Sequence, residues 1–428
     1  MKYHIEHNES YSFASIISPK SPIVAAYITV DIHQASTASN QAAQAIYSDA
    51  LLSGNARHSR AEFLNAINML GATIGVSIGN GVLNITLKAR TENFAKLLKL
   101  TDEMLTAPAF TKEELVRIKS TVTNELHEAK EDSKSASFSG LLNSIYGHSD
   151  RKYTYEIDET ITKIKSVTTK DLKKLHQLVI SQLWTCSIAA EPVSSTNFEK
   201  LIKKLKKNTN SVQVEGIHQQ KPPKPGVKLK EIASRTNVDF SIGAPLPITL
   251  HHPDYIPLSL GLAVLGKCGG FSGRLMSTVR ELEGLTYGIY SRLEGFTGTE
   301  QGYWRIMTFF APDKAMQGLE STIREVTLLF EKGITEEELE RFKTIVSTQQ
   351  TLLNDSVAGL LSELHTYHCH GFTLAEMKEH KARISTLTLK EVNKAIKIYL
   401  DPTLLTISGA GPVNSVQTEI KDLIKSVQ

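Results

Sequence analysis

The side chains best suited to metal or acid–base chemistry gather in one short stretch, ELHTYHCHG, in the last quarter of the chain. It contains His365, His368, Cys369 and His370. Because His365 and His368 are three positions apart, they share one face of a helix and could bind the same metal ion. The alternative is a helix end near Gly371 whose histidines lie at an interface. No neighbouring Glu occupies the position of a general base, so we favour the interface.

The remaining reactive groups form no recognisable catalytic set. The three cysteines, Cys186, Cys268 and Cys369, lie far apart in the sequence, and no two of them form a Cys-x-x-Cys motif. Neither Cys186 nor Cys268 has a nearby histidine that would indicate a thiol nucleophile. The glycine-rich residues 266–270 lack the spacing of a phosphate-binding P-loop. An odd number of scattered cysteines indicates a reducing compartment rather than a disulfide framework.

A second distinctive stretch, residues 269–296, has the sequence GGFSGRLMSTVRELEGLTYGIYSRLEGF. A glycine-rich turn precedes a helical pattern with an Arg, and Gly-Leu-x-Tyr then leads into a strand pattern. This order closely resembles a hallmark stretch of the pitrilysin, insulinase and mitochondrial-processing-peptidase family, whose active members are zinc peptidases called inverzincins. The resemblance rests on Gly269, Gly270, Arg274, Leu275, Arg280, Glu281, Gly284, Leu285 and Tyr287.

The resemblance implies that Arg280 and Tyr287 contact the substrate. A guanidinium and a phenol both donate hydrogen bonds. Near a scissile carbonyl they would hold the peptide and stabilise negative charge developing on oxygen. The alternative is that Arg280 is a helix-surface residue paired with Glu281 or Glu283. Tyr287 would then be a core aromatic of a strand.

The zinc-binding motif of this family, His-x-x-Glu-His on a helix of the first half, is absent from the sequence. The resemblance places its positions at Ala45, Ser48 and Asp49. Ala45 has no donor atom, and Ser48 cannot act as the general base. The distal ligand matches Glu125, at 125 − 49 = 76 positions after Asp49. One Glu and one Asp do not make a zinc site, so we expect no metal and no cofactor in this chain.

These features predict a non-catalytic subunit of a two-chain zinc peptidase. A homologous partner would carry the zinc, and this chain would supply the Arg/Tyr contacts to an unfolded peptide held as an added strand at a sheet edge. One alternative is a non-hydrolytic peptide-binding or scaffold protein of the same fold, working as a homodimer. Another is an independent enzyme with an altered metal site.

The elements that must position these residues alternate between strand and helix patterns in the first half. The predicted strands are 3–8, 11–18, 21–32 and 183–192, with a β-hairpin over 73–89 that turns at 79–81. The predicted helices are 40–53, 59–71, 92–105 and 111–129. We expect Asn40 to cap the first helix and Gly71 to end the second.

The second half repeats the pattern of the first. FTKEELVRIKS at Phe110 is similar to ITEEELERFKT at Ile334, an offset of 334 − 110 = 224. SVTTKDLKKL at Ser166 is similar to TLTLKEVNKA at Thr386, an offset of 386 − 166 = 220. Residues 185–193 and 406–413 match at nearly the same offset. Three collinear matches favour a duplicated unit.

The predicted organisation is an N-terminal peptidase-like domain with the degenerate zinc site at 1–207, a linker at 208–230, and a C-terminal domain with the Arg/Tyr motif at 231–428. The fold class expected from the family is α+β. Two homologous α/β-sandwich lobes, each a mostly antiparallel sheet with helices packed on it, would form a clamshell.

Composition narrows the partners and the location. The net charge of 48 − 45 = +3, without a dense basic tract, does not indicate a nucleic-acid partner. No apolar stretch approaches the length of a membrane span, and the N-terminus has no apolar signal region. We therefore expect a cytoplasmic protein.

Overall fold

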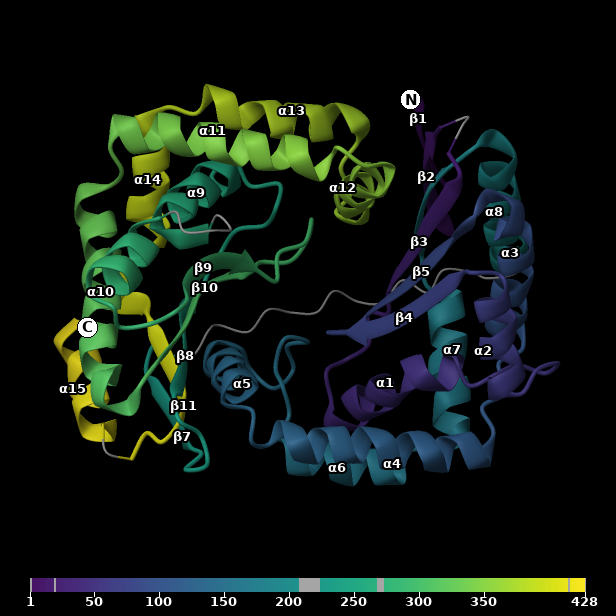
Figure 1. The fold of residues 1–428 in the computed structure, drawn as a ribbon, viewed down its shortest axis with the longest axis horizontal. Coiled ribbons are helices and arrows are strands. Elements are labelled where there is room, and N and C mark those ends of the chain that lie inside the picture. The colour runs from purple at the N-terminus through teal and green to yellow at the C-terminus, as the bar shows by residue number, and fades with distance from the viewer. Residues whose placement is uncertain (1, 19–20, 208–223, 268–272, 415, 428) are drawn as a thin grey trace. The chain divides into compact units, whose positions relative to one another are not determined.

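The computed structural model describes residues 2–18, 21–207, 224–267, 273–414 and 416–427 (Figure 1). Contacts divide the chain into two compact units, and neither unit is one continuous stretch of sequence. Unit 1 consists of Met1–His127, Tyr155–His218 and Leu353–Leu374. Unit 2 consists of Glu128–Thr154, Gln219–Leu352 and Ala375–Gln428.

Unit 1 is built on a six-stranded sheet with the strand order β1-β2-β6-β3-β5-β4. Its strands are β1 (Lys2–His7), β2 (Tyr11–Ile17), β3 (Ile23–Asp31), β4 (Thr73–Gly79), β5 (Val82–Arg90) and β6 (Trp184–Ala190). Neighbouring strands are antiparallel except β2 and β6. The β4–β5 hairpin turns through Asn80 and Gly81, which both have the positive φ that a type I′ turn requires.

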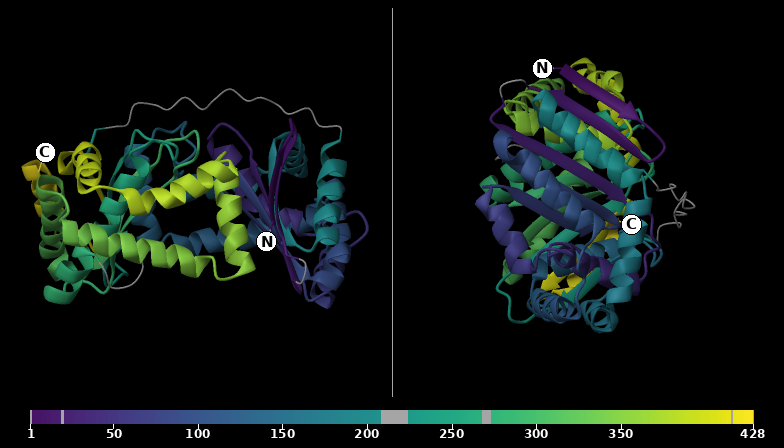
Figure 2. Two further views of the ribbon diagram at one scale, coloured as in Figure 1. Left: turned by 90° about the horizontal axis from the view of Figure 1, so that it is seen from above. Right: turned by 90° about the vertical axis from the view of Figure 1, so that its right-hand side faces the viewer.

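Helices cover one face of this sheet, and the right-hand view of Figure 2 shows some of them lying across its strands. Successive side chains of a strand point to opposite faces, so Val24, Ala26 and Ile28 of β3 all enter the core beneath the helices. The helices of this unit are α1 (Ala38–Leu51), α2 (Arg60–Met69), α3 (Thr91–Thr106), α4 (Lys112–Ala129), α6 (Ile157–Ser166), α7 (Thr169–Ser181) and α8 (Pro192–Lys206).

The other face of the unit 1 sheet carries small and polar side chains. Ser12 of β2 and Ser187 of β6 are buried there, because helix α12 (Val357–Cys369) packs on β2, β3 and β6. Helix α12 therefore belongs to unit 1, although it comes from the second half of the sequence.

Unit 2 is built on a five-stranded sheet with the order β7-β11-β8-β10-β9. Its strands are β7 (Val227–Glu231), β8 (Val238–Pro245), β9 (Ile289–Glu294), β10 (Tyr303–Phe310) and β11 (Thr406–Gly411), and only the β11–β7 pair is parallel within the described residues. Its helices include α9 (Tyr255–Leu262), η1 (Ala263–Lys267), η2 (Met276–Leu282), η3 (Pro312–Lys314), α10 (Ala315–Lys332), α11 (Glu336–Leu353), α13 (Leu374–Thr386), α14 (Leu389–Tyr399), η4 (Pro402–Leu404) and α15 (Gln417–Val427).

The second face of the unit 2 sheet is covered by α5 (Ser133–Ile145), which comes from the first half of the sequence. Ser133 donates a hydrogen bond of 2.5 Å to Asp239 of β8, and the hydroxyls of Ser137 and Ser241 lie 3.3 Å apart. The residue numbers of α5 and α12 differ by 357 − 133 = 224, which is an offset of the internal repeat. The two units have therefore exchanged equivalent helices.

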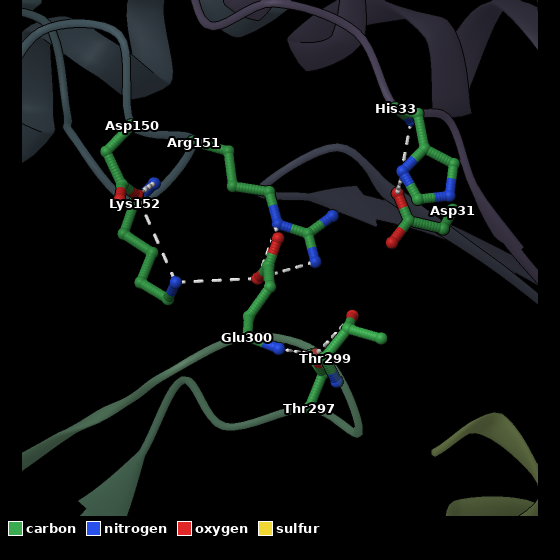
Figure 3. Close-up of polar contacts among 8 residues, drawn as sticks. All are labelled: Asp31, His33, Asp150, Arg151, Lys152, Thr297, Thr299 and Glu300. Atoms are coloured by element: carbon green, nitrogen blue, oxygen red, sulfur yellow. Dashed lines mark hydrogen bonds and ion pairs between the residues drawn. The ribbon is translucent and has the colours of Figure 1, made fainter. Parts of the chain in front are cut away.

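The segment that follows α5 is anchored in unit 2 by a buried ionic cluster (Figure 3). The guanidinium of Arg151 donates to the carboxylate of Glu300 over 2.9 and 2.7 Å, and the ammonium of Lys152 lies 3.4 Å from the same carboxylate. Arg151 and Lys152 are both buried, so Glu300 compensates charges that would otherwise be costly to remove from water.

The internal repeat extends to the hydrogen bonds that cap two helices. Thr168 and Thr388 each cap a helix, α7 and α14, and each forms a reciprocal capping box with an acidic residue three positions later, Asp171 and Glu391. The numbers of these threonines differ by 388 − 168 = 220, so the duplication predicted from sequence extends to the capping chemistry.

Most predicted elements of the first half are confirmed, with boundaries moved by a few residues. One detail is wrong: Thr37, not Asn40, caps α1, because the Thr37 hydroxyl accepts from the backbone N–H of Asn40. Of the predicted linker, residues 208–223 lie outside the described part, and β7 begins at Val227. The domain boundaries at 207 and 231 stay predictions.

The α+β fold class with two sheet-and-helix lobes is confirmed, and the clamshell arrangement stays a prediction. Among the described residues, no helix combines the length and apolar character needed to cross a membrane.

Candidate functional site

Within the described part of the glycine-rich motif, the first helical element is η2, a short π-helix in unit 2. Glu283 donates its backbone N–H to the carbonyl of Thr278, five residues earlier, over 3.0 Å. Leu275, Met276 and Val279 on the inner side of this turn are buried in the unit 2 core. Such wide turns occur often at functional sites. The motif's first glycines, Gly269 and Gly270, lie outside the described residues.

Charged contacts attach η2 to α10 and α11. Arg274 donates two hydrogen bonds, of 2.8 and 2.7 Å, to the carboxylate of Glu338, and a third of 2.9 Å to the carbonyl of Gly333. Arg324 of α10 pairs with Glu283 just after η2. Burial alone would raise the pKa of Glu338, but hydrogen bonds from Arg274 and Thr335 outweigh it and lower this pKa. Arg274 therefore has a structural role in this motif.

Tyr287 projects from a segment whose neighbouring residues are held in place. Gly284, with φ of +63°, ends the helical turn, and Leu285 then enters the core. The Thr286 hydroxyl accepts from the N–H of Gly288 over 3.2 Å and from the hydroxyl of Thr308 on β10 over 3.5 Å. Between these fixed points Tyr287 is 85% exposed. The alternative that Tyr287 is a core aromatic is therefore wrong.

Arg280 lies on η2, on the other side of the Gly284 turn from Tyr287. Its side chain is half-buried, and its backbone carbonyl accepts from the N–H of Gly284 over 3.1 Å. Leu282, between the two, is 81% exposed, so Leu282 and Tyr287 are the most exposed large hydrophobic side chains among the described residues. Two large side chains left in water so close in sequence indicate a contact surface.

The positions of the missing zinc motif lie on the surface of unit 1. Ala45 and Asp49 on α1 are exposed and Ser48 is half-buried, whereas Ile46 of the same helix is buried. Glu125 on α4 is exposed. Within the described residues, no group of three or more His, Cys, Asp or Glu side chains is arranged to hold a metal ion. Since Ala45 and Ser48 also lack the required donors, these residues do not fit zinc.

A pocket of about 620 Å³ lies beside α1, against α6 and α7. Lys163, Lys174 and Gln177 contribute to its lining. None of the four zinc-motif positions lines it, so this pocket is separate from them.

The histidine cluster near the end of α12 faces the unit 1 sheet. The ring nitrogens of His365 and His368 lie within hydrogen-bonding distance of strand hydroxyls: Thr29 and Ser187 for His365, Ser12 and Ser187 for His368. The interface predicted for these histidines is therefore confirmed. Sequence reasoning missed the three hydroxyl partners because they come from three different strands, and single serines and threonines have no motif.

Comparisons with known proteins agree with this picture. A family model described as "Peptidase M16 inactive domain" matches residues 166–346. Over 357 residues the chain is 22% identical to the "Non-peptidase homolog YmxG" of Helicobacter pylori, covering 81% of this chain and 79% of that protein.

Solved structures share the fold. A peptidase M16 inactive domain from Pseudomonas fluorescens superposes with a TM-score of 0.84 at 20% identity, covering 96% of this chain and 98% of that one. The periplasmic protease PqqL from Escherichia coli superposes with a TM-score of 0.74 at 15% identity, covering 94% of this chain and 44% of PqqL. The predicted cytoplasmic location stays a prediction.

The family model is described as inactive, and the curated relative is described as a non-peptidase homologue. The fold of the Pseudomonas fluorescens structure matches 96% of this chain. The resemblance that the glycine-rich motif suggested is thus confirmed: residues 166–346 match the inactive-domain model of the M16 peptidase family, and the chain shares its fold with a solved M16 inactive-domain structure.

Proposed function

We propose that this chain is the non-catalytic subunit of a two-chain zinc peptidase. A homologous partner subunit supplies the zinc centre, and this chain supplies Arg280 and Tyr287 as donors to the peptide that the partner cleaves. The guanidinium and the phenol hold the scissile carbonyl and stabilise the negative charge that develops on its oxygen.

The observation that carries the proposal is the exposure of Tyr287 in an otherwise anchored segment. A tyrosine gains free energy from burying its ring, and here the ring is 85% exposed while Leu285 and Thr286 beside it are buried. Tyrosines in this state are enriched at binding surfaces, where the ring supplies contact area and the hydroxyl supplies a hydrogen bond.

The neighbouring strand supports peptide binding by strand addition. β9 begins at Ile289, two residues after Tyr287, and it stands at the end of the unit 2 sheet. Among the described strands it pairs with β10 alone, and in this proposal an extended peptide adds to its other edge.

The test is co-expression with a homologue that carries His-x-x-Glu-His, followed by purification and a peptidase assay. We expect a complex in which Tyr287→Phe and Arg280→Ala each lower kcat/KM by about 10- to 100-fold, because a donor to the transition state is lost. Tyr3→Phe and Arg57→Ala, changes at exposed residues of unit 1, should leave kcat/KM unchanged. Complex formation with unaltered kinetics in both motif variants would remove the proposed role.

The alternative is a homodimeric protein of the same fold that binds peptide, or serves as a scaffold, without hydrolysis. It is favoured by a curated relative described as a non-peptidase homologue. Peptide-binding and association assays on the purified chain distinguish the two functions. Peptide binding lost in Tyr287→Phe, together with no association with any zinc-motif homologue, would favour this alternative.

A further inference from the structure

Helix α12 is attached to the unit 1 sheet through a chain of hydrogen bonds that starts on β5. The Thr29 hydroxyl donates its single proton to the side-chain oxygen of Asn84 over 2.7 Å. It can therefore only accept from the Nε2–H of His365, which lies 2.8 Å away. A neutral His365 protonated at Nε2 has an unprotonated Nδ1, which accepts from the Ser187 hydroxyl over 2.9 Å.

The same reasoning continues to the second histidine. Because Ser187 has given its proton to His365, it accepts from Nδ1–H of His368 over 3.2 Å. The unprotonated Nε2 of His368 then accepts from the Ser12 hydroxyl. Ser12 in turn accepts from the Nδ1–H of His7 on β1, 2.5 Å away.

The result is a relay in which each hydroxyl bridges two side chains and each bridging histidine carries one ring proton. Reversing every donor and acceptor leaves that proton count unchanged, so neutral His365 and His368 are compatible with the bridging hydroxyls in either direction. The relay runs His7–Ser12–His368–Ser187–His365–Thr29–Asn84.

An additional proton on either histidine displaces the hydroxyl proton that its ring nitrogen accepted, and for Ser12 the remaining acceptor is the more distant Glu6 carbonyl, at 3.4 Å. A second N–H on His365 would point at Ser187, whose oxygen already accepts from His368, and the Ser187 proton would lose its partner. The new positive charge would also lie in a poorly solvated interface, since His368 is only 4% exposed.

The surroundings do not compensate such a charge. The titratable groups that face the two histidines are Tyr27 from β3, His7 from β1, and Cys369 and His370 from the end of α12; on β6, Cys186 interacts with Cys369. None of the contacts described for His365 or His368 is to a carboxylate.

We propose that this relay is an acid-sensitive latch: acidification protonates His365 and His368 and releases α12 from the unit 1 sheet. Release uncovers Ser12, Ser187 and Thr29, and it frees a helix that the second half of the chain contributes to unit 1. The latch is independent of the proposed partnership with a zinc-bearing subunit.

The direction and pH range follow from the histidines. Burial, followed by the neighbouring histidines, lowers the pKa of His365 from 6.5 to about 3, and burial with His7 lowers the pKa of His368 to about 4. Because these bases are harder to protonate when α12 is docked, docking is at full strength above pH 6.5 and weakens as the pH falls below it. At pH 5 each histidine disfavours docking by up to about 30-fold, and both together by about 1,000-fold.

Helix α5, the exchanged helix of unit 2, is an internal control. Its contact to the sheet uses the carboxyl of Asp239, whose pKa is raised, chiefly by burial. A raised carboxyl pKa has the opposite sign: acidification relieves the cost of burying the charge, so α5 stays docked or binds more firmly.

The test is amide hydrogen exchange of the full-length protein at pH 7 and pH 5, corrected for intrinsic exchange rates. We expect the protection of residues 357–369 to fall by two to three orders of magnitude, while that of residues 133–145 changes less than about threefold. The double variant His365→Gln/His368→Gln, whose amides do not titrate, should show no selective loss in α12 at pH 5. His127→Gln, at an exposed histidine of α4, should behave like the unaltered protein.

Equal protection of both helices at pH 5 would overturn the latch. The latch would also be overturned if the double variant lost the protection of residues 357–369 at pH 5 as readily as the unaltered chain. If the double variant does not dock α12 even at pH 7, deuterium exchange at the C2 position of each histidine ring in the unaltered protein decides. Ring pKa values near 6.5 for His365 and His368 would refute the proposal, and values below 5 would support it.

Discussion

At the scale of single residues, the glycine-rich motif contains two arginines with different environments. Arg274 lies against α11, where a planar guanidinium satisfies the Glu338 carboxylate and the Gly333 carbonyl together. Arg280 lies six positions later on η2 and is half-buried. A motif that names both residues does not reveal that Arg274 is the one that anchors the motif to α11.

Arg274→Ala should lower the free energy of unfolding of unit 2 by about 2 kcal/mol, because Glu338 and the Gly333 carbonyl lose their donor. Trp304 is buried in unit 2, so urea denaturation followed by its fluorescence in a Trp184→Phe background measures this loss. Since the pair lowers the pKa of Glu338, its contribution is present above pH 4.5 and shrinks as the pH falls further.

The matched control for that measurement is Arg383→Ala. Arg383 pairs with Glu391 at the surface of the same unit, and both side chains are a third or more exposed. Such pairs contribute little, so the expected loss is about 0.5 kcal/mol. If Arg274→Ala cost no more than this control, the anchoring role of Arg274 would be wrong.

At the scale of elements, the two repeats share the hydrogen bonds that cap a helix more closely than they share the surrounding amino-acid sequence. α7 and α14 begin with the same Thr-based capping box, although few other positions of the two segments are identical. A cap needs one hydroxyl and one acidic side chain at fixed spacing, whereas core positions accept many apolar residues.

Thr168→Ala and Thr388→Ala should therefore have nearly equal effects. Each removes a hydroxyl that accepts from the backbone N–H three residues on, and each should destabilise the start of its helix by about 1 kcal/mol. Hydrogen exchange of residues 169–173 and 389–393 measures the local effect. Thr162→Ala, within α6, serves as the comparison, because its hydroxyl bonds only a carbonyl of its own helix. Unequal effects at the two caps would show that the repeats have diverged in stability.

At the scale of the whole molecule, the exchange of α5 and α12 joins the two halves of the chain. Each helix covers one face of a sheet to which the other half of the sequence contributes all of the strands. Without α12, the unit 1 sheet would expose Ser187 and its buried neighbours. Without α5, the unit 2 sheet would lose the contact between Leu141 and Tyr303. Exchanged elements of this kind make folding of the halves mutually dependent.

Residues 1–207 expressed alone should therefore be poorly soluble or bind a hydrophobic dye, and so should residues 224–428. Expressed together, the two fragments should co-purify through a tag on one of them. Residues 1–207 joined through a flexible linker to residues 353–374 should recover cooperative unfolding of unit 1, because α12 is then supplied. A fragment 1–207 that unfolds cooperatively by itself would show that the exchange contributes little.

Much of the local structure was predictable from sequence. The hairpin turn at Asn80 and Gly81, the strand alternation of β3 and the helix signals before α4 and α7 depend on neighbours within a few residues, so the sequence displays them directly. The cap of α1 was placed wrongly at Asn40 because Thr37 is an equally good cap three positions earlier, and local patterns do not choose between them.

By itself the sequence determined the resemblance to the M16 peptidase family, the duplication and the absence of the zinc donors, since each depends on which residues occur and at what spacing. Only the tertiary structure decided where α5 and α12 pack, that Tyr287 is exposed, and that His365 and His368 meet Ser12, Thr29 and Ser187. Those contacts join residues more than 100 positions apart, and their formation depends on the packing of whole sheets rather than on any local preference of the chain.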